Sequence, residues 1–142
     1  MVRLNPYINF NGEAEEAMNF YKSVFGGELT LSRFGDVQGM PVEDQYKQYI
    51  MHADLTASDI RFFASDANAH GGVQVGQNMA MSLSGDYDAK LTEYFEGLAA
   101  GGNVTEPLKT APWGDKFGML TDKFGINWMV NISAEATAEG TS

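Results

Sequence analysis

The sequence predicts an α+β fold of two tandem βαβββ modules, and three observations support this. Strand-like and helix-like hydrophobic periods follow one another in the same order in both halves of the chain. Matching residues recur at an offset of 75 positions, as shown by Phe20 and Phe95 and by the pairs Gly26–Gly27 and Gly101–Gly102. The length of 142 residues suits one domain.

The domain is therefore expected to consist of one module over about residues 1–70, a second over about 71–135, and a short C-terminal tail. Each half alone would leave the apolar face of its sheet unburied, which explains why both copies are present.

The first module opens with a predicted strand over Leu4–Phe10, in which polar and apolar side chains alternate. Asn11 is the predicted N-cap of a helix that ends at Gly26 and Gly27. The apolar stripe of this helix recurs at helical spacing and comprises Ala14, Ala17, Met18, Tyr21, Val24 and Phe25.

Three more strands complete the first module. They are predicted over Glu28–Phe34, Gln48–Thr56 and Ile60–Ser65. The polar segment Gly35–Lys47 is predicted to be a loop that could cover a pocket. The glycine-rich segment Asp66–Gln77 is predicted to connect the two modules.

The second module repeats this order from Asn78. Alternating Met79, Met81 and Leu83 predict a strand with both methionines in the core, and Asp86 is the predicted N-cap of the next helix. That helix carries Leu91, Tyr94, Phe95 and Leu98 at helical spacing. Strands are predicted near Asn103–Leu108, Phe117–Thr121 and Ile126–Ile132, with Trp128 in the core, before the tail Ser133–Ser142.

Charge and composition limit the classes of binding partner that we expect. Nine basic and 19 acidic residues leave a formal net charge of −10, which repels phosphate backbones and anionic lipids, so neither nucleic acid nor a membrane is an expected partner. The acidic surface either keeps the protein soluble or attracts cationic small molecules. The chain has no cysteine, hence no thiol chemistry, and its first ten residues do not resemble a signal peptide, so we expect a cytoplasmic protein.

Several segments resemble the PhnB-like proteins of the vicinal oxygen chelate (glyoxalase/bleomycin resistance/dioxygenase) superfamily. They are PYINFNGEAEEAMNFYKSVFGGE, MHADL, ASDA and PLKTAPWGDKFGMLTDKFGINWMVN, which together cover nearly the whole chain. The resemblance implies two βαβββ modules whose sheets curve around a shared cavity, in a homodimer.

In metal-dependent relatives of this kind, four inward side chains bind a divalent ion. Strand parity places these positions at Asn5, at His52 or Asp54, at Asn78 and at Met129. Amides are weak donors and a thioether favours soft ions, so we predict no glyoxalase-type metal centre and no cofactor.

His52 and Asp54 share one face of a strand and could act together as acid and base. Alternatively, the histidine hydrogen-bonds a neighbouring strand or lines a wet cavity. His70, in the glycine-rich connection, is expected to face solvent.

Trp113 lies in the turn PWGDKFG, which the resemblance places at the mouth of the cavity, where an indole could stack on a ligand. It could equally cover the core or contact the other copy of a dimer. The complete set of predicted ligand-binding residues is Asn5, Tyr7, Asn9, His52, Asn78, Trp113, Phe117 and Met129.

These features predict a protein that binds a small organic molecule. One alternative is a metal-dependent lyase, isomerase or dioxygenase with His52 and Asp54 as catalytic residues, and another is a protein that sequesters cationic drugs. Relatives are often labelled ubiquinone-pathway methyltransferases, but no strand here is followed by a glycine-rich turn and helix that could hold a nucleoside cofactor.

Overall fold

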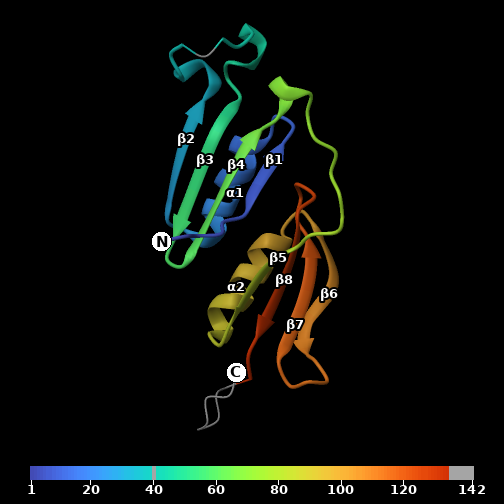
Figure 1. The fold of residues 1–142 in the computed structure, drawn as a ribbon. Helices are drawn as coiled ribbons and strands as arrows, with labels where there is room; N and C mark the ends of the chain where they lie inside the picture. The colour runs from blue at the N-terminus through green and yellow to red at the C-terminus, as the bar shows by residue number, and fades with distance from the viewer. Residues whose placement is uncertain (40, 135–142) are drawn as a thin grey trace. The chain divides into compact units, whose positions relative to one another are not determined.

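The structure is a computed structural model that describes residues 1–39 and 41–134. The chain divides into two compact units, Met1–Gln74 and Val75–Ser142 (Figure 1). Each unit contains one helix and one mixed four-stranded sheet, which confirms the predicted α+β fold of two βαβββ modules. The cavity shared by both modules stays a prediction, and residues 135–142 of the predicted tail lie outside the described residues.

The sheet of unit 1 has the strand order β1-β4-β3-β2, with β1 parallel to β4 and the other neighbours antiparallel. Its elements are β1 (Tyr7–Phe10), α1 (Ala14–Phe25), β2 (Glu28–Arg33), β3 (Ile50–Ala57) and β4 (Ile60–Asp66). The predicted loop and connection contain the short 3₁₀ turns η1 (Phe34–Asp36), η2 (Asp44–Tyr46) and η3 (Asn68–His70).

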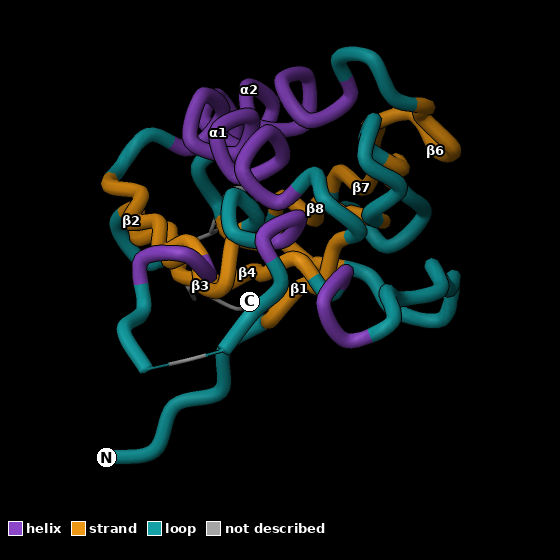
Figure 2. Tube along the Cα trace, turned by 90° about the horizontal axis from the view of Figure 1, so that it is seen from above, coloured by secondary structure: helices purple, strands orange, loops and turns teal. Residues whose placement is uncertain are grey.

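Helix α1 covers one face of this sheet (Figure 2). The predicted stripe forms the contact, because all of its residues are buried except the half-buried Val24. Leu55 and Phe62 meet the helix from β3 and β4, and the ring of Phe62 lies 5.6 Å from that of Tyr21. Among the described residues of unit 1, no α-helix packs on the other face of the sheet, which we call the helix-free face.

The prediction that Asn11 caps α1 is wrong. Glu13 occupies the N-cap position without a capping side-chain hydrogen bond. The Asn11 amide instead bonds the backbone of Val73 in both directions, donating to its carbonyl at 2.8 Å and accepting from its N–H at 2.7 Å. Asn11 therefore attaches the end of unit 1 to the β1–α1 turn.

Asp66, at the end of β4, takes over the capping of α1. Its Oδ1 accepts hydrogen bonds from the backbone N–H groups of Gly12 and Ala14, both at 2.9 Å, and its Oδ2 accepts one from Ile50 at 2.9 Å. A carboxylate suits the positive end of the helix dipole, and three donors offset the cost of burying a side chain that is only 2% exposed.

Unit 2 repeats this order, and its sheet runs β5-β8-β7-β6. Trp128 is buried as predicted, with Leu120 and Val130 on the same side of the sheet. The prediction that Met79 belongs to the core is wrong, because the first strand begins only at Met81 and Met79 is 79% exposed. The elements are β5 (Met81–Gly85), α2 (Asp88–Ala99), β6 (Asn103–Thr110), β7 (Lys116–Thr121) and β8 (Asn127–Ile132).

The helix of unit 2 also begins differently from the prediction. Tyr87, rather than Asp86, occupies the N-cap position of α2, and no side chain caps it by a hydrogen bond. The predicted apolar stripe still packs on the sheet, since Leu91, Phe95 and Leu98 are buried.

The predicted duplication has a physical basis at Gly27 and Gly102. A Cβ atom at Gly27 would lie 2.2 Å from the carbonyl oxygen of Thr56, and one at Gly102 would lie 2.3 Å from that of Thr121. Both units therefore need a glycine where the chain leaving the helix passes over the end of the central hairpin.

Among the described residues, no helix is long and apolar enough to cross a membrane.

Candidate functional site

The helix-free face of the unit 1 sheet carries a cluster of three rings. The His52 ring lies 5.2 Å from Phe63 and 5.9 Å from Tyr7, and the Tyr7 and Phe63 rings are 6.1 Å apart. His52 and Tyr7 are both predicted ligand-binding residues, and the structure brings them together. The strands achieve this because β1 pairs Tyr7 with Phe63 across the sheet.

Beside this cluster, Asp54 is bound by Arg61. The guanidinium donates from Nη2 to Oδ2 of Asp54 at 2.8 Å and from Nε to Oδ1 at 3.3 Å, and Thr56 adds a donor at 3.1 Å. The hydrogen bond from Arg61 is the main cause of a lowered Asp54 pKa, and the nearby His52 lowers this pKa further. Within the described part of the chain, no hydrogen bond joins His52 to Asp54.

A small pocket of about 350 Å³ lies at one end of the ring cluster. Two of its residues, Tyr7 and Asn9, belong to the predicted ligand-binding set. His70 reaches the pocket from η3, although it is exposed as predicted, and its ring lies 6.1 Å from that of Phe34. The lining consists of Tyr7, Asn9, Phe34, Met51, Ser65, Asp66, Ala67 and His70.

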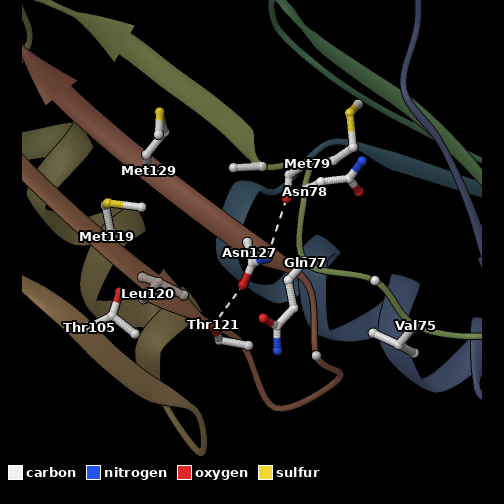
Figure 3. A pocket seen from close by; sticks show the side chains of 13 residues that line it. Val75, Gln77, Asn78, Met79, Thr105, Met119, Leu120, Thr121, Asn127 and Met129 are labelled. Carbon is white, nitrogen blue, oxygen red and sulfur yellow. Dashed lines mark hydrogen bonds between the residues drawn. The ribbon is translucent and has the colours of Figure 1, made fainter.

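The larger hollow, of about 860 Å³, lies in unit 2 on the side of β7 and β8 away from α2 (Figure 3). Two predicted ligand-binding residues, Asn78 and Met129, line it. Its lining is Val75, Gly76, Gln77, Asn78, Met79, Ala80, Thr105, Met119, Leu120, Thr121, Gly125, Asn127 and Met129, and none of these residues is ionisable.

Asn127 holds one wall of this hollow in place. Its Oδ1 accepts a hydrogen bond from Thr121 Oγ1 at 2.8 Å, and its Nδ2 donates to the carbonyl oxygen of Met79 at 3.3 Å (Figure 3). The first bond orients the amide within the sheet, and the second attaches the segment before β5 to that sheet. We call residues 75–80 the wall segment.

The sequence reasoning missed Met119 and Asn127 as lining residues. Met119 lies opposite Met129 in the β7–β8 ladder, and Thr121 lies opposite Asn127. Strand alternation could have indicated Asn127, because it lies two residues from Met129 on the same strand and therefore on the same face. Met119 would then have required the pairing of the two strands.

The remaining predicted residues occupy other places. Trp113 is 62% exposed and its ring lies 5.8 Å from that of Phe117, but neither residue lines the hollow. Asn5 donates a long hydrogen bond of 3.4 Å to the carbonyl oxygen of Arg61. Their role in binding stays a prediction.

The donors at the predicted metal positions fit a hard or borderline divalent ion poorly. In unit 1 the Asn5 side chain is a neutral amide, both oxygens of Asp54 already accept hydrogen bonds from Arg61, and only the alternative His52 is a side chain that such an ion favours. In unit 2 the corresponding side chains are the amide of Asn78 and the thioether of Met129. Among the described residues, no group of three or more histidine, aspartate and glutamate side chains could hold a metal ion.

This chain matches one protein family and is similar to several proteins of known structure. Residues 3–131 match the protein family described as 3-demethylubiquinone-9 3-methyltransferase. The crystal structure of protein PA1353 from Pseudomonas aeruginosa is similar, with 36% identity, 95% of this chain and 100% of that chain covered, and a TM-score of 0.85. A PhnB protein from Bacillus cereus shows 27% identity, 93% and 100% coverage and a TM-score of 0.73.

The fold extends to more distant proteins. A glyoxalase/bleomycin resistance protein/dioxygenase family enzyme from Burkholderia phytofirmans PsJN is 14% identical, with 89% of this chain and 95% of that chain covered and a TM-score of 0.58. At this identity the likeness concerns the fold, which is the one that the sequence predicted.

Proposed function

The chain belongs to the family described as 3-demethylubiquinone-9 3-methyltransferase, as a PhnB-like member of the vicinal oxygen chelate type, and on this premise we propose that it binds a small organic molecule without a glyoxalase-type metal centre. The observation that carries the proposal is the hollow of about 860 Å³ in unit 2, which lies within the size range of ligand pockets.

The hollow suits binding because its floor and its wall are each held in place by hydrogen bonds. The floor is the sheet, where Met119 and Met129 are half-buried cross-strand neighbours. The wall segment is attached through the Asn127 hydrogen bond to Met79. A floor set by the ladder and a wall set by a side chain preorganise the site, which lowers the entropy cost of binding.

The methyl transfer in the family description needs a nucleoside cofactor, and the start of α1 fits one poorly. Helix N-termini bind such groups through free backbone N–H donors. Here the N–H groups of Gly12 and Ala14 are bound by the buried carboxylate of Asp66. The start of α1 therefore gives no support for methyl transfer.

We further propose that the binding form is a homodimer that engages neither nucleic acid nor membranes. The net charge of −10 supports the second part, because it disfavours contact with phosphate-rich surfaces.

Methionine ε-methyl NMR can test the proposed site, because a ligand in the hollow must lie near Met79, Met119 or Met129. We expect a bound compound from a panel of small metabolites to shift these methyl signals and to leave Met18, a buried residue of α1 in unit 1, unchanged. Substitution of Met129 by Leu assigns one signal. Binding that shifts only unit 1 signals would disprove the proposed site.

A further inference from the structure

We infer that the hollow of unit 2 selects uncharged aromatic ligands with a hydrogen-bonding edge, and that it rejects their charged analogues. This inference rests on the proposed function and names the ligand class of that site.

Within the part of the chain that the structure describes, the lining contains no acidic or basic side chain that could pair with an ionic ligand. Its polar groups are the amides of Gln77, Asn78 and Asn127 and the hydroxyls of Thr105 and Thr121. An ion that entered would lose hydration without gaining a counter-charge, whereas a neutral ligand would lose little. This neutrality is notable in a chain with 28 acidic and basic residues, the sum of 19 and nine.

Several corresponding positions carry charged or aromatic side chains in unit 1. The glycine contacts described above make Thr56 the counterpart of Thr121, and the strand registers then align the neighbouring pairs. Thr56 lies opposite Arg61 in unit 1, whereas Thr121 lies opposite Asn127 in unit 2. The guanidinium of one unit is thus replaced by an amide in the other.

The next pair of each hairpin differs in the same direction. Asp54 lies opposite Phe63 in unit 1, and Met119 lies opposite Met129 in unit 2. One fold thus carries an ion pair and a ring on one copy, and two thioethers and an amide on the other. The neutrality of the hollow is a property of its side chains and is not imposed by the fold.

Three thioethers favour an aromatic ligand over an aliphatic one. Met79, Met119 and Met129 all contribute to the lining, and Figure 3 shows the side chains of Met119 and Met129 on adjacent strands at the same face. Methionine sulfur is polarisable and makes favourable contacts with aromatic rings, and its unbranched side chain adapts to the ring that it meets.

The amides supply the hydrogen-bonding edge. Both polar atoms of the Asn127 side chain already take part in hydrogen bonds, Oδ1 with Thr121 and Nδ2 with Met79. Asn78 and Gln77 are exposed on the wall segment, and within the described residues neither makes a side-chain hydrogen bond. Each therefore offers one donor group and one acceptor to a ligand.

The test uses two fluorescent probes that share one ring system. N-phenylnaphthylamine is uncharged, and anilinonaphthalene sulfonate carries an added sulfonate. We expect the uncharged probe to bind about tenfold more tightly or better, and to shift the methyl signals of Met79, Met119 and Met129. Equal affinity, or tighter binding of the sulfonate at these methyl signals, would overturn the inference and leave the binding proposal standing.

A charge introduced into the hollow should reverse this selectivity. Met119→Lys is expected to weaken the uncharged probe and to strengthen the sulfonate, each by about tenfold. Gln38→Lys, on an exposed loop of unit 1, makes the same change in net charge and should leave the ratio unchanged. A similar reversal in Gln38→Lys would show that net charge sets the preference and would overturn the inference.

Met119→Leu controls for the loss of the methionine side chain at this position. It keeps the volume and neutrality of the site and should retain the preference for the uncharged probe. If Met119→Lys fails to fold, Thr105→Lys places the same charge on β6 at the edge of the hollow, and the same reversal is expected. Probes that shift only Met18 or Met51 would instead disprove the proposed site.

Discussion

Arg61 binds both carboxylate oxygens of Asp54, through Nη2 at 2.8 Å and Nε at 3.3 Å. The same guanidinium lies 5.2 Å from the centre of the Phe63 ring, so that an ion pair and a ring are connected on the helix-free face of unit 1. The hydrogen bond from Arg61 lowers the pKa of Asp54, so this carboxylate is a poor candidate for the acid of the predicted acid–base pair.

Asp54→Asn is expected to reduce stability slightly at neutral pH. The pKa of Asp54 is lowered in the folded protein, mainly by the Arg61 hydrogen bond, so its contribution is full above the pKa of the unfolded carboxyl and is lost as the pH falls through the folded value. The difference in urea midpoint between variant and wild type should therefore shrink on acidification. An equal difference in urea midpoint at neutral and acidic pH would contradict a stabilising interaction between Asp54 and Arg61.

Asp66→Asn should be far more damaging. The amide retains one acceptor oxygen and presents an NH₂ group to a backbone N–H, so at least one buried donor loses its partner. We expect a loss of about 2 kcal/mol in the free energy of unfolding, measured by urea denaturation. Asp59→Asn, in the exposed β3–β4 turn, is the matched control and should change stability little. Equal effects would refute the capping role.

Gly27→Ala tests the close approach that underlies the duplication. Gly26 and Gly27 both have positive φ, of 76° and 84°, so alanine is strained at either position. A Cβ atom at Gly26 meets nothing within 4 Å, whereas at Gly27 it would overlap the carbonyl of Thr56. Thermal unfolding should show Gly27→Ala to be less stable than Gly26→Ala by about 1–3 kcal/mol.

Asn127→Ala is expected to release the wall segment. The variant loses the bonds to Thr121 and to Met79, and because the site is only half-buried, stability should fall by no more than about 1 kcal/mol. The affinity for N-phenylnaphthylamine should drop about tenfold, as measured by fluorescence titration. Asn103→Ala, at an exposed asparagine that begins β6, serves as control, and a comparable drop there would argue against the Asn127 hydrogen bonds as the support of the wall segment.

The fold could be predicted to a large extent because its signals are local. The stripe from Ala14 to Phe25 and the glycines after each helix follow from short-range periodicity and turn chemistry. Met79 shows where this reasoning fails. Met79 alternates with Met81 as in a strand, but β5 and its pairing with β8 begin only at Met81. Alternation in the sequence does not show at which residue strand pairing starts.

Strand parity indicated part of the lining of the unit 2 hollow, whereas the role of these residues in binding stays a prediction. Asn78 and Met129 were found through strand parity, and both line the hollow. Asn127 was missed because its importance depends on a hydrogen bond to Met79, which lies 48 residues away in the sequence. Asp54 was assigned to the correct face, but its partner Arg61 comes from the neighbouring strand.

Hydrophobic period and glycine placement were therefore sufficient to establish two βαβββ modules, because those features act between residues close together in the chain. Three properties were decided only by the tertiary structure: Asp66 as the cap of α1, the hydrogen bond that attaches the wall segment to the sheet, and the neutral lining of the unit 2 hollow. Each depends on side chains that meet only after strands have paired, and a linear pattern does not encode which partner a polar group will find.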